Sequence, residues 1–358
     1  MSKHLLRTGM SKLPKANLGF FPTPLHKLDN ISKDIGVNIF MKREDFSGLG
    51  IFGGNKIRKL EYLMGEAINK NCDTVITYGA TQSNHALQTI AAANKLGLKA
   101  VVLLVEFVKP KELKSNFLLN HVMDADIRTI PVGDMNIEEI TKEVMVQGRA
   151  IVEEYQRRGH KVFDCPVGGN NELGSIGAID TYLEISEQMH GYGGVDYIVQ
   201  TTGTGGSLSG LQAARTVMGE DNAIEIISIS AAPREDLERY CLDISTIASG
   251  SLTKLGIDKN CTPSHLKVDC SFVGQGYELP SEGGTNAIHY VAKREGITLD
   301  PTYTGKGFDG LLHYVNSGVI PQGSNVVFIH TGGSVALFSE SEIVGELGNS
   351  KTSNANDD

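Results

Sequence analysis

The feature that most constrains the fold is the alternation of two hydrophobic patterns along the chain. Short β-branched runs predict strands that are buried on both faces. Between these runs lie stretches with a helical period: the apolar positions from Ile57 to Ile68 share one helix face, and a second helix begins after Asn84. Buried strands joined by amphipathic helices predict parallel sheets and hence an α/β fold. The runs interpreted as strands are Val37–Met41, Thr74–Tyr78, Ala100–Val105, Asp196–Gln200, Ile224–Ser230 and Asn325–His330.

Length and charge limit the functions to consider. A chain of 358 residues is long for one domain and suits two packed α/β domains. The formal net charge of −9 disfavours nucleic acid and anionic membranes as partners. We find neither a signal-peptide pattern nor an apolar run of the roughly 18 residues that a membrane-spanning helix needs. The polar segment 346–358 predicts a disordered tail.

The five cysteines are widely spread and contain no C-x-x-C pair, which is typical of reduced thiols in the cytoplasm. Cys261, His265 and Cys270 form the one cluster that suggests zinc. A closed zinc site needs a fourth ligand and more regular spacing. We therefore predict a cytoplasmic protein without a metal.

Ligands of parallel sheets bind where loops leave the carboxyl ends of strands, so four loops become candidates. In the first, Phe52–Leu60, two glycines permit close backbone approach, and Lys56 and Lys59 lie one turn apart at a helix start. Cations there oppose the helix dipole. One amine could be a nucleophile with a lowered pKa while the other binds an anion. From the motif alone, a solvated basic helix start is an equally good interpretation.

The second loop, Gly79–His85, leads from a strand into a helix. Ser83 and Asn84 are good N-cap residues, and that structural role alone explains one of them. Donors gathered at a helix N-terminus also suit a carboxylate or a phosphate. His85, taken alone, is more commonly a capped or packed histidine than a base.

The third loop, Thr201–Ser207, is rich in glycine and leaves backbone N–H groups free to surround a phosphate. It is similar to a dinucleotide fingerprint, so an NAD-dependent oxidoreductase is one alternative. That site needs an acidic residue after the next strand, where this chain has Ala231-Ala232-Pro233. A mononucleotide-sized phosphate fits better. The fourth loop, Ile329–Ser334, also follows a strand; Tyr277 and Tyr303, taken alone, would be packing residues.

Several long motifs follow one another along the chain: Pro22–Leu25, Lys42–Asp45, Gly53–Glu61, Gln82–His85, Val167–Gly169, Gly276-Tyr277 with Pro280, Asp300–Lys306 and His330–Gly333. Together they resemble the fold type II pyridoxal-phosphate enzymes of the D-cysteine desulfhydrase and 1-aminocyclopropane-1-carboxylate (ACC) deaminase family. The resemblance spans Pro22 to Phe338. It implies a two-domain, tryptophan synthase β-like fold with twisted parallel sheets and flanking helices. The large domain would comprise residues 1–59 and 167–345, and the inserted small domain residues 60–166.

The resemblance also implies pyridoxal 5′-phosphate as cofactor, a small amino acid as substrate and a homodimer. Lys56 matches the lysine that binds the cofactor aldehyde, and freed from it this amine would be the base that removes the α-proton. Asn84 matches the partner of the phenolic oxygen, and Thr331 offers a hydroxyl to the ring nitrogen. Phosphate contacts fall to Lys59, Thr202, Gly203, Thr204, Gly205 and Gly206; substrate contacts to Ser83, Asn84, His85, Gly168 and Tyr303; and further catalytic roles to Ser83, Tyr277 and Tyr303.

Two positions help to choose within the family. ACC deaminases usually carry Glu and Leu where this chain has Thr304 and Thr331. A threonine hydroxyl cannot keep the ring nitrogen protonated, but the weaker electron sink suffices when a good β-leaving group departs. We therefore predict a D-cysteine desulfhydrase, with L-cysteate sulfo-lyase as the alternative and ACC deaminase third. The leaving group, the chirality and any effect of Leu87 stay open. A non-catalytic cofactor-binding protein is disfavoured because Lys56, Ser83, Asn84 and Tyr303 are all present.

Overall fold

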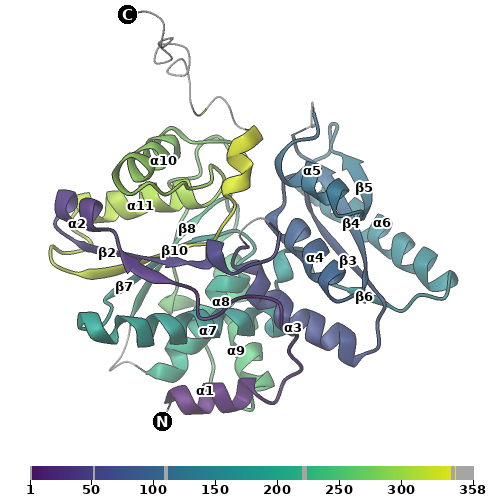
Figure 1. Cartoon of the computed structure of the whole chain (residues 1–358), viewed down its shortest axis with the longest axis horizontal. Coiled ribbons are helices and arrows are strands. Elements are labelled where there is room, and N and C mark those ends of the chain that lie inside the picture. Colours follow the sequence, from purple (N-terminus) through teal and green to yellow (C-terminus); the bar gives the residue numbers. More distant parts are fainter. Residues whose placement is uncertain (1, 51–52, 109–111, 220–223, 340–342, 344–358) are drawn as a thin grey trace, which may run out of the picture.

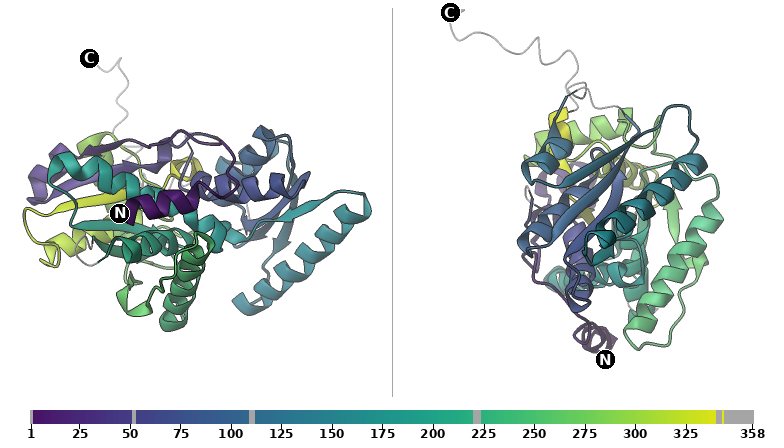
Figure 2. Two further views of the ribbon diagram at one scale, coloured as in Figure 1. Left: turned by 90° about the horizontal axis from the view of Figure 1, so that it is seen from below. Right: turned by 90° about the vertical axis from the view of Figure 1, so that its right-hand side faces the viewer.

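A computed structural model describes residues 2–50, 53–108, 112–219, 224–339 and 343 of the chain. It contains two sheets that lie side by side along the long axis (Figures 1 and 2). The expected tail, 346–358, lies outside the described residues.

The larger sheet has six strands in the order β1-β2-β10-β7-β8-β9, and only the β1–β2 pair is antiparallel. Along β10 the side chains alternate between two cores. Val327 and Ile329 face the core that α1, α7, α8 and α9 complete, whereas Val326 and Phe328 face the one formed with α2, α10 and α11. Burial on both faces explains why this strand is an uninterrupted apolar run. The strands are β1 Leu25–Lys27, β2 Asn38–Arg43, β7 Tyr197–Thr202, β8 Glu225–Ser230, β9 Lys267–Asp269 and β10 Asn325–His330.

The smaller sheet has four parallel strands in the order β5-β4-β3-β6. Strand β4 alternates in the same way: Val101 and Leu103 pack with α6, and Val102 and Leu104 pack with α4. The edge strands β5 and β6 are largely half-buried or exposed and lack the continuous apolar run that predicted β3 and β4. The strands are β3 Thr74–Ala80, β4 Lys99–Glu106, β5 Asp126–Pro131 and β6 Val162–Asp164.

Helices cover both faces of the large sheet and flank the small one (Figure 1). Both helices expected from sequence are present. None of the described helices is long and apolar enough to cross a membrane. The helices are α1 Ser2–Met10, α2 Asp29–Ile35, α3 Lys56–Asn69, α4 Asn84–Lys95, α5 Ser115–Val122, α6 Ile137–Arg157, α7 Glu172–Gln188, α8 Gly206–Met218, α9 Leu237–Lys254, α10 Glu282–Glu295 and α11 Thr304–Asn316.

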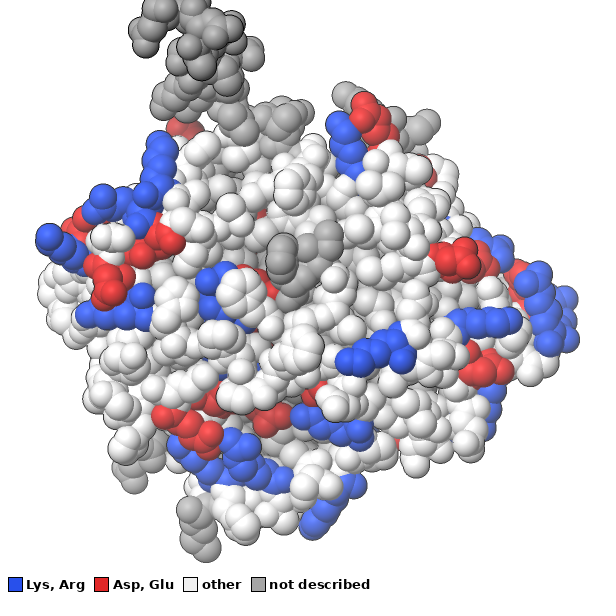
Figure 3. All heavy atoms as spheres, in the orientation of Figure 1, with Lys and Arg blue, Asp and Glu red and all other residues white. Residues whose placement is uncertain are grey.

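The small sheet is formed by residues 74–164, and the large sheet takes its strands from both sides of that segment. Helix α3 runs through the expected boundary at residue 59/60 and packs against α7 of the large sheet. The predicted domain limits, 1–59 with 167–345 and 60–166, remain a prediction. On the face shown in Figure 3, acidic and basic side chains are interspersed around the periphery, with no continuous basic patch.

Candidate active site

A cavity of about 670 Å³ lies where the carboxyl ends of strands from the two sheets meet. Its volume is in the range of small-molecule sites. The cavity brings together every residue that the sequence nominated for the site. These are Lys56, Lys59, Ser83, Asn84, His85, Gly168, Thr202, Gly203, Thr204, Gly205, Gly206, Tyr277, Tyr303 and Thr331.

Lys56 is the first residue of α3, and the loop before it is fixed to the loop after β10. The backbone N–H of Asn55 donates to the Thr331 carbonyl (3.1 Å), and Gly54 pairs with Gly332. The Lys56 ammonium donates to Asn55 Oδ1 at 3.3 Å. Burial lowers the pKa of Lys56 to about 8, although the charge of Asp300 opposes this shift. An appreciable fraction of the amine is therefore unprotonated, as a nucleophile requires.

Lys59 is a buried amine for which the described residues supply no carboxylate partner. Its side chain is 1% exposed, and its one hydrogen bond within the described chain goes to the Gly168 carbonyl (3.2 Å). Burial and the neighbouring charge of Lys56 hold the pKa of Lys59 well below its usual value. A Cβ on Gly206, at the start of α8, would lie 2.7 Å from Lys59 Nζ, so the ammonium lies beside a helix N-terminus. Free N–H groups and a buried cation suit a phosphate.

Two adjacent residues at the start of α4 have different roles. The Ser83 hydroxyl oxygen accepts from the Ala86 N–H at 3.1 Å and caps the helix, as one sequence interpretation held. Asn84 Oδ1 accepts from Asn116 Nδ2 at 2.7 Å, which orients the amide. Asn84 Nδ2 makes no hydrogen bond with a described residue, and a Cβ on Gly333 would lie 2.8 Å from it. The Asn84 amide is therefore oriented with a free donor at the cavity wall.

The two tyrosines form one pair, with their hydroxyl oxygens 2.7 Å apart. Burial raises the pKa of both Tyr277 and Tyr303, so both stay protonated near neutral pH. Asp300 orders the backbone around Tyr303, since its carboxylate accepts from the backbone N–H groups of residues 302, 303 and 304. It also accepts from the Thr304 hydroxyl at 2.6 Å.

His85 is a packed histidine. It is 3% exposed, and its Nε2 lies 2.9 Å from the Thr77 hydroxyl oxygen. Burial and the charges of Lys56 and Lys59 hold the pKa of His85 well below its usual value, so the ring is neutral. This environment disfavours a role as an acid at neutral pH.

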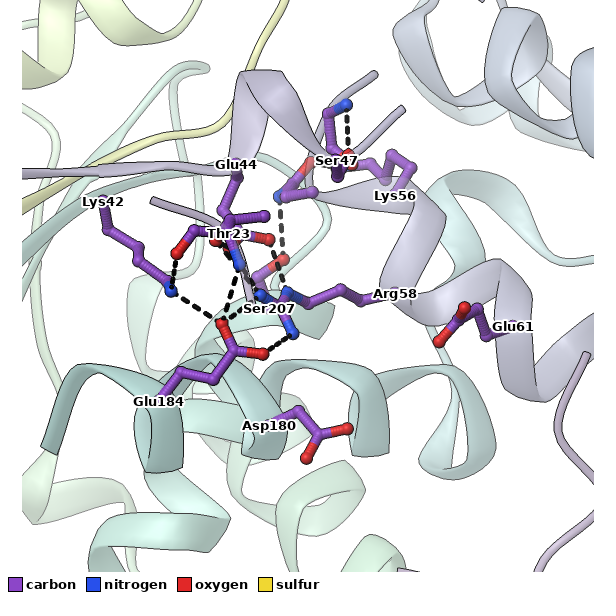
Figure 4. A network of polar contacts seen from close by, with 12 residues as sticks. Thr23, Lys42, Glu44, Ser47, Lys56, Arg58, Glu61, Asp180, Glu184 and Ser207 are labelled. Carbon is purple, nitrogen blue, oxygen red and sulfur yellow. Dashed lines mark hydrogen bonds and ion pairs between the residues drawn. The ribbon is translucent and has the colours of Figure 1, made fainter. Parts of the chain in front are cut away.

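A buried ion network supports α3 directly beneath Lys56 (Figure 4). The Arg58 guanidinium donates to both oxygens of Glu44 (2.6 and 2.8 Å) and to both oxygens of Glu184 (2.9 and 2.7 Å). Lys42 adds a bond to Glu184 at 2.6 Å and one to the Thr23 carbonyl. The network joins β2, the turn after it, α3 and α7, and so it fixes the helix that carries Lys56.

Among the polar residues of the cavity that the sequence analysis did not nominate, Asn55 and Arg234 make contacts that shape the site. Asn55 Nδ2 donates to the Ser207 hydroxyl at 3.0 Å and thereby links the residue before α3 to the first turn of α8. Arg234 donates to the Gly203 carbonyl and stacks on Tyr240, with its guanidinium carbon 4.0 Å from the ring centroid. Arg234 follows β8 closely, so its place after a central strand was a usable signal. That segment had been considered only for an acidic residue.

Other features flagged from sequence lie outside the cavity. Leu87 is buried and does not line it. Cys261 contacts the Thr216 hydroxyl, and His265 contacts Thr262. Within the described ranges, no three His, Cys, Asp or Glu side chains are grouped as metal ligands would be.

Comparison with known proteins defines the class. The family model described as "Pyridoxal-phosphate dependent enzyme" matches residues 16–332. A Pyrococcus horikoshii protein named "Putative 1-aminocyclopropane-1-carboxylate deaminase" is 38% identical over 329 residues, covering 92% of this chain and 94% of that protein. A Schizosaccharomyces pombe protein named "Probable 1-aminocyclopropane-1-carboxylate deaminase" is 34% identical, covering 92% and 97%.

Comparison with solved structures supports the same class of enzyme. The structure titled "Crystal Structure Analysis of the ACC deaminase homologue" has 34% identity and a TM-score of 0.83, covering 94% of this chain and 97% of its own. O-ureido-L-serine synthase, at 15% identity and a TM-score of 0.63, shares the fold alone.

The protein is thus an α/β enzyme of fold type II that uses pyridoxal phosphate. The chain belongs to the pyridoxal-phosphate-dependent enzyme family, among relatives named as ACC deaminases. The predictions of fold class, enzyme and cofactor are confirmed, and the alternative of an NAD-dependent oxidoreductase is set aside.

Proposed function

We propose that this enzyme catalyses α,β-elimination on a small β-substituted amino acid, with D-cysteine as the first candidate and pyruvate, ammonia and sulfide as products. Lys56 would hold the cofactor, and Lys59 with the Thr202–Gly206 loop would hold its phosphate. Asn84 would donate to the phenolic oxygen, and Thr331 would face the ring nitrogen. Homodimer assembly and a cytoplasmic location remain predictions.

The observation that carries the proposal is the contrast between two threonines. Thr331 lines the cavity, and its hydroxyl makes no hydrogen bond within the described chain, so it is available to the ring nitrogen. Thr304, where ACC deaminases usually have Glu, is fully buried and bonded to Asp300. The Asp300 carboxylate already accepts four hydrogen bonds from residues 302–304. A neutral partner for the ring nitrogen favours loss of a good leaving group over opening of a cyclopropane.

When bound, the cofactor supplies an electron sink that acidifies the substrate's α-proton. The Lys56 amine, with its pKa lowered to about 8, removes that proton. The Ser83 hydroxyl keeps its own proton for the substrate carboxylate, because its oxygen already caps α4. The protonated Tyr277–Tyr303 pair uses one hydroxyl hydrogen between the two rings and offers the other near the β-substituent, and the pair cannot act as a base near neutral pH.

L-Cysteate is the second candidate, because Arg234 brings a cation to the cavity wall where a sulfonate could bind. Two asparagines that follow the Gly168-Gly169 pair, Asn170 and Asn171, are engaged in other contacts. Asn170 Nδ2 donates to the Thr204 carbonyl at 2.7 Å, and Asn171 caps α7. A thiol leaving group needs no such donors.

A substrate panel tests the proposal. Reconstituted enzyme is given D-cysteine, L-cysteine, L-cysteate, D-serine, β-chloroalanine and ACC, and the keto acid is identified in each case. We expect pyruvate from cysteine or another β-substituted substrate. Product from ACC alone would refute the inference from Thr304 and Thr331.

A further inference from the structure

One part of the cavity wall is apolar, unlike the part formed by the lysines, Asn84 and the tyrosine pair. The small-sheet side contributes the apolar side chains of Val105, Phe107, Ile140, Val144 and Met145. Val105 lies at the end of β4 and Phe107 directly after that strand. Ile140 and Val144 are four residues apart on α6, and Met145 follows Val144. We call this set the apolar rim. It continues directly into the catalytic corner, because the Phe107 ring lies edge-on to Tyr277 with 6.2 Å between centroids.

The rim is more apolar and more exposed than catalysis on cysteine alone requires. Phe107 is 40% exposed and Met145 is 59% exposed, although both face a site for a small polar amino acid. Arg149 is the charged side chain of α6 that lines the cavity. Exposed apolar surface that lines a binding cavity indicates that an apolar part of a ligand is covered there. Val105 and Ile140 are already buried, but a thiol is too small to cover the exposed Phe107 and Met145.

We propose that the rim binds the β-substituent of S-alkyl or S-aryl cysteine conjugates, which the enzyme cleaves as a cysteine-conjugate β-lyase. This inference rests on the proposed elimination and specifies its substrate class. The Cα–H bond and the Cβ–S bond break, and the substituent leaves as a thiolate that takes up a proton. The remaining enamine takes up water. The conjugate R–S–CH2–CH(NH3+)–COO− and one water therefore give RSH, pyruvate and ammonium.

The test compares S-benzylcysteine with cysteine, using the enantiomer of cysteine that the wild-type enzyme turns over. We expect kcat/KM for the benzyl conjugate to be about tenfold higher or more, since each well-packed methylene contributes roughly tenfold or more. Met145→Gln is a near-isosteric polar change. It should lower kcat/KM for the benzyl conjugate about fivefold and change kcat/KM for cysteine by no more than about twofold. Val146→Gln is the matched control, because Val146 is the next residue on α6, 46% exposed and outside the cavity lining.

A binding measurement separates recognition from turnover. In Lys56→Ala protein with excess cofactor, calorimetry should show that Met145→Gln raises the Kd of S-benzylcysteine about fivefold. Turnover of cysteine without turnover of the conjugate would overturn the inference and leave the proposed function intact. Pyruvate from neither substrate would also overturn the inference, and pyruvate from no β-substituted amino acid of the substrate panel would refute the proposed function itself. Loss of dimer in light scattering by Met145→Gln, with unchanged selectivity, would assign the rim to contact between two copies and also overturn the inference.

Discussion

Removing the guanidinium of Arg58 should destabilise the enzyme far more than removing a surface guanidinium. Arg58 makes four bonds to Glu44 and Glu184 and a fifth to the Thr23 hydroxyl at 3.2 Å. Glu44 is fully buried, and in Arg58→Met it would keep a charge with only the Thr23 hydroxyl as donor among the described side chains. Breaking a buried pair in this way costs about 3–5 kcal/mol.

The matched control is Arg7→Met. Arg7 Nη2 donates to both carboxylate oxygens of Glu187, each at 2.9 Å, but both side chains are nearly half exposed. Such a pair contributes about 0–1 kcal/mol because water screens it. Urea unfolding of both variants, followed by circular dichroism, gives the difference in free energy of unfolding. If Arg58→Met costs no more than Arg7→Met, the network is not what stabilises the start of α3.

Three further predictions concern the cofactor site. Lys59→Met should raise the melting temperature of cofactor-free protein, because a buried unpaired cation is removed, while the Kd for pyridoxal phosphate rises at least tenfold; equal melting temperatures would contradict this account of Lys59. Gly206→Ala places a Cβ 2.7 Å from Lys59 Nζ and 2.8 Å from Asn170 Oδ1, so cofactor affinity by fluorescence titration should fall about tenfold or more, whereas Gly191→Ala, with nothing within 4 Å, should leave it unchanged. The rate of cofactor capture, followed by absorbance, should rise with pH and level off above about 8, since only unprotonated Lys56 reacts; a rate that is flat from pH 6 to 9 would rule out that pKa.

Much of the fold follows from patterns that one sequence displays. The central strands β3, β4, β7, β8 and β10 are largely buried, so their sequences are rich in apolar and β-branched residues. The edge strands were missed for the opposite reason. Strand β9 is three residues of mixed burial, and its pairing with β8 supplies a stability that its own sequence does not reveal.

The family resemblance supplied the candidate site residues, and they line one cavity because their motifs stand at strand ends. Their roles remain predictions. What the sequence could not show is which hydroxyls and amides are already engaged. Thr304 and Thr331 are the same residue type, yet the Thr304 hydroxyl donates to Asp300, whereas Thr331 lines the cavity and its hydroxyl has no partner among the described residues. Phe107 reaches the site through tertiary packing, which no local pattern encodes, whereas Arg234 could have been found from its position just after β8.

The most direct test of the central claim measures the products from D-cysteine in wild-type and Lys56→Ala enzyme, each reconstituted with pyridoxal phosphate. Sulfide, pyruvate and ammonia are quantified in the same reaction. Wild type should release the three in equal amounts, and Lys56→Ala should lose at least about a thousandfold in kcat. Undiminished sulfide release by Lys56→Ala, or no keto acid from D-cysteine while ACC is converted, would contradict the account.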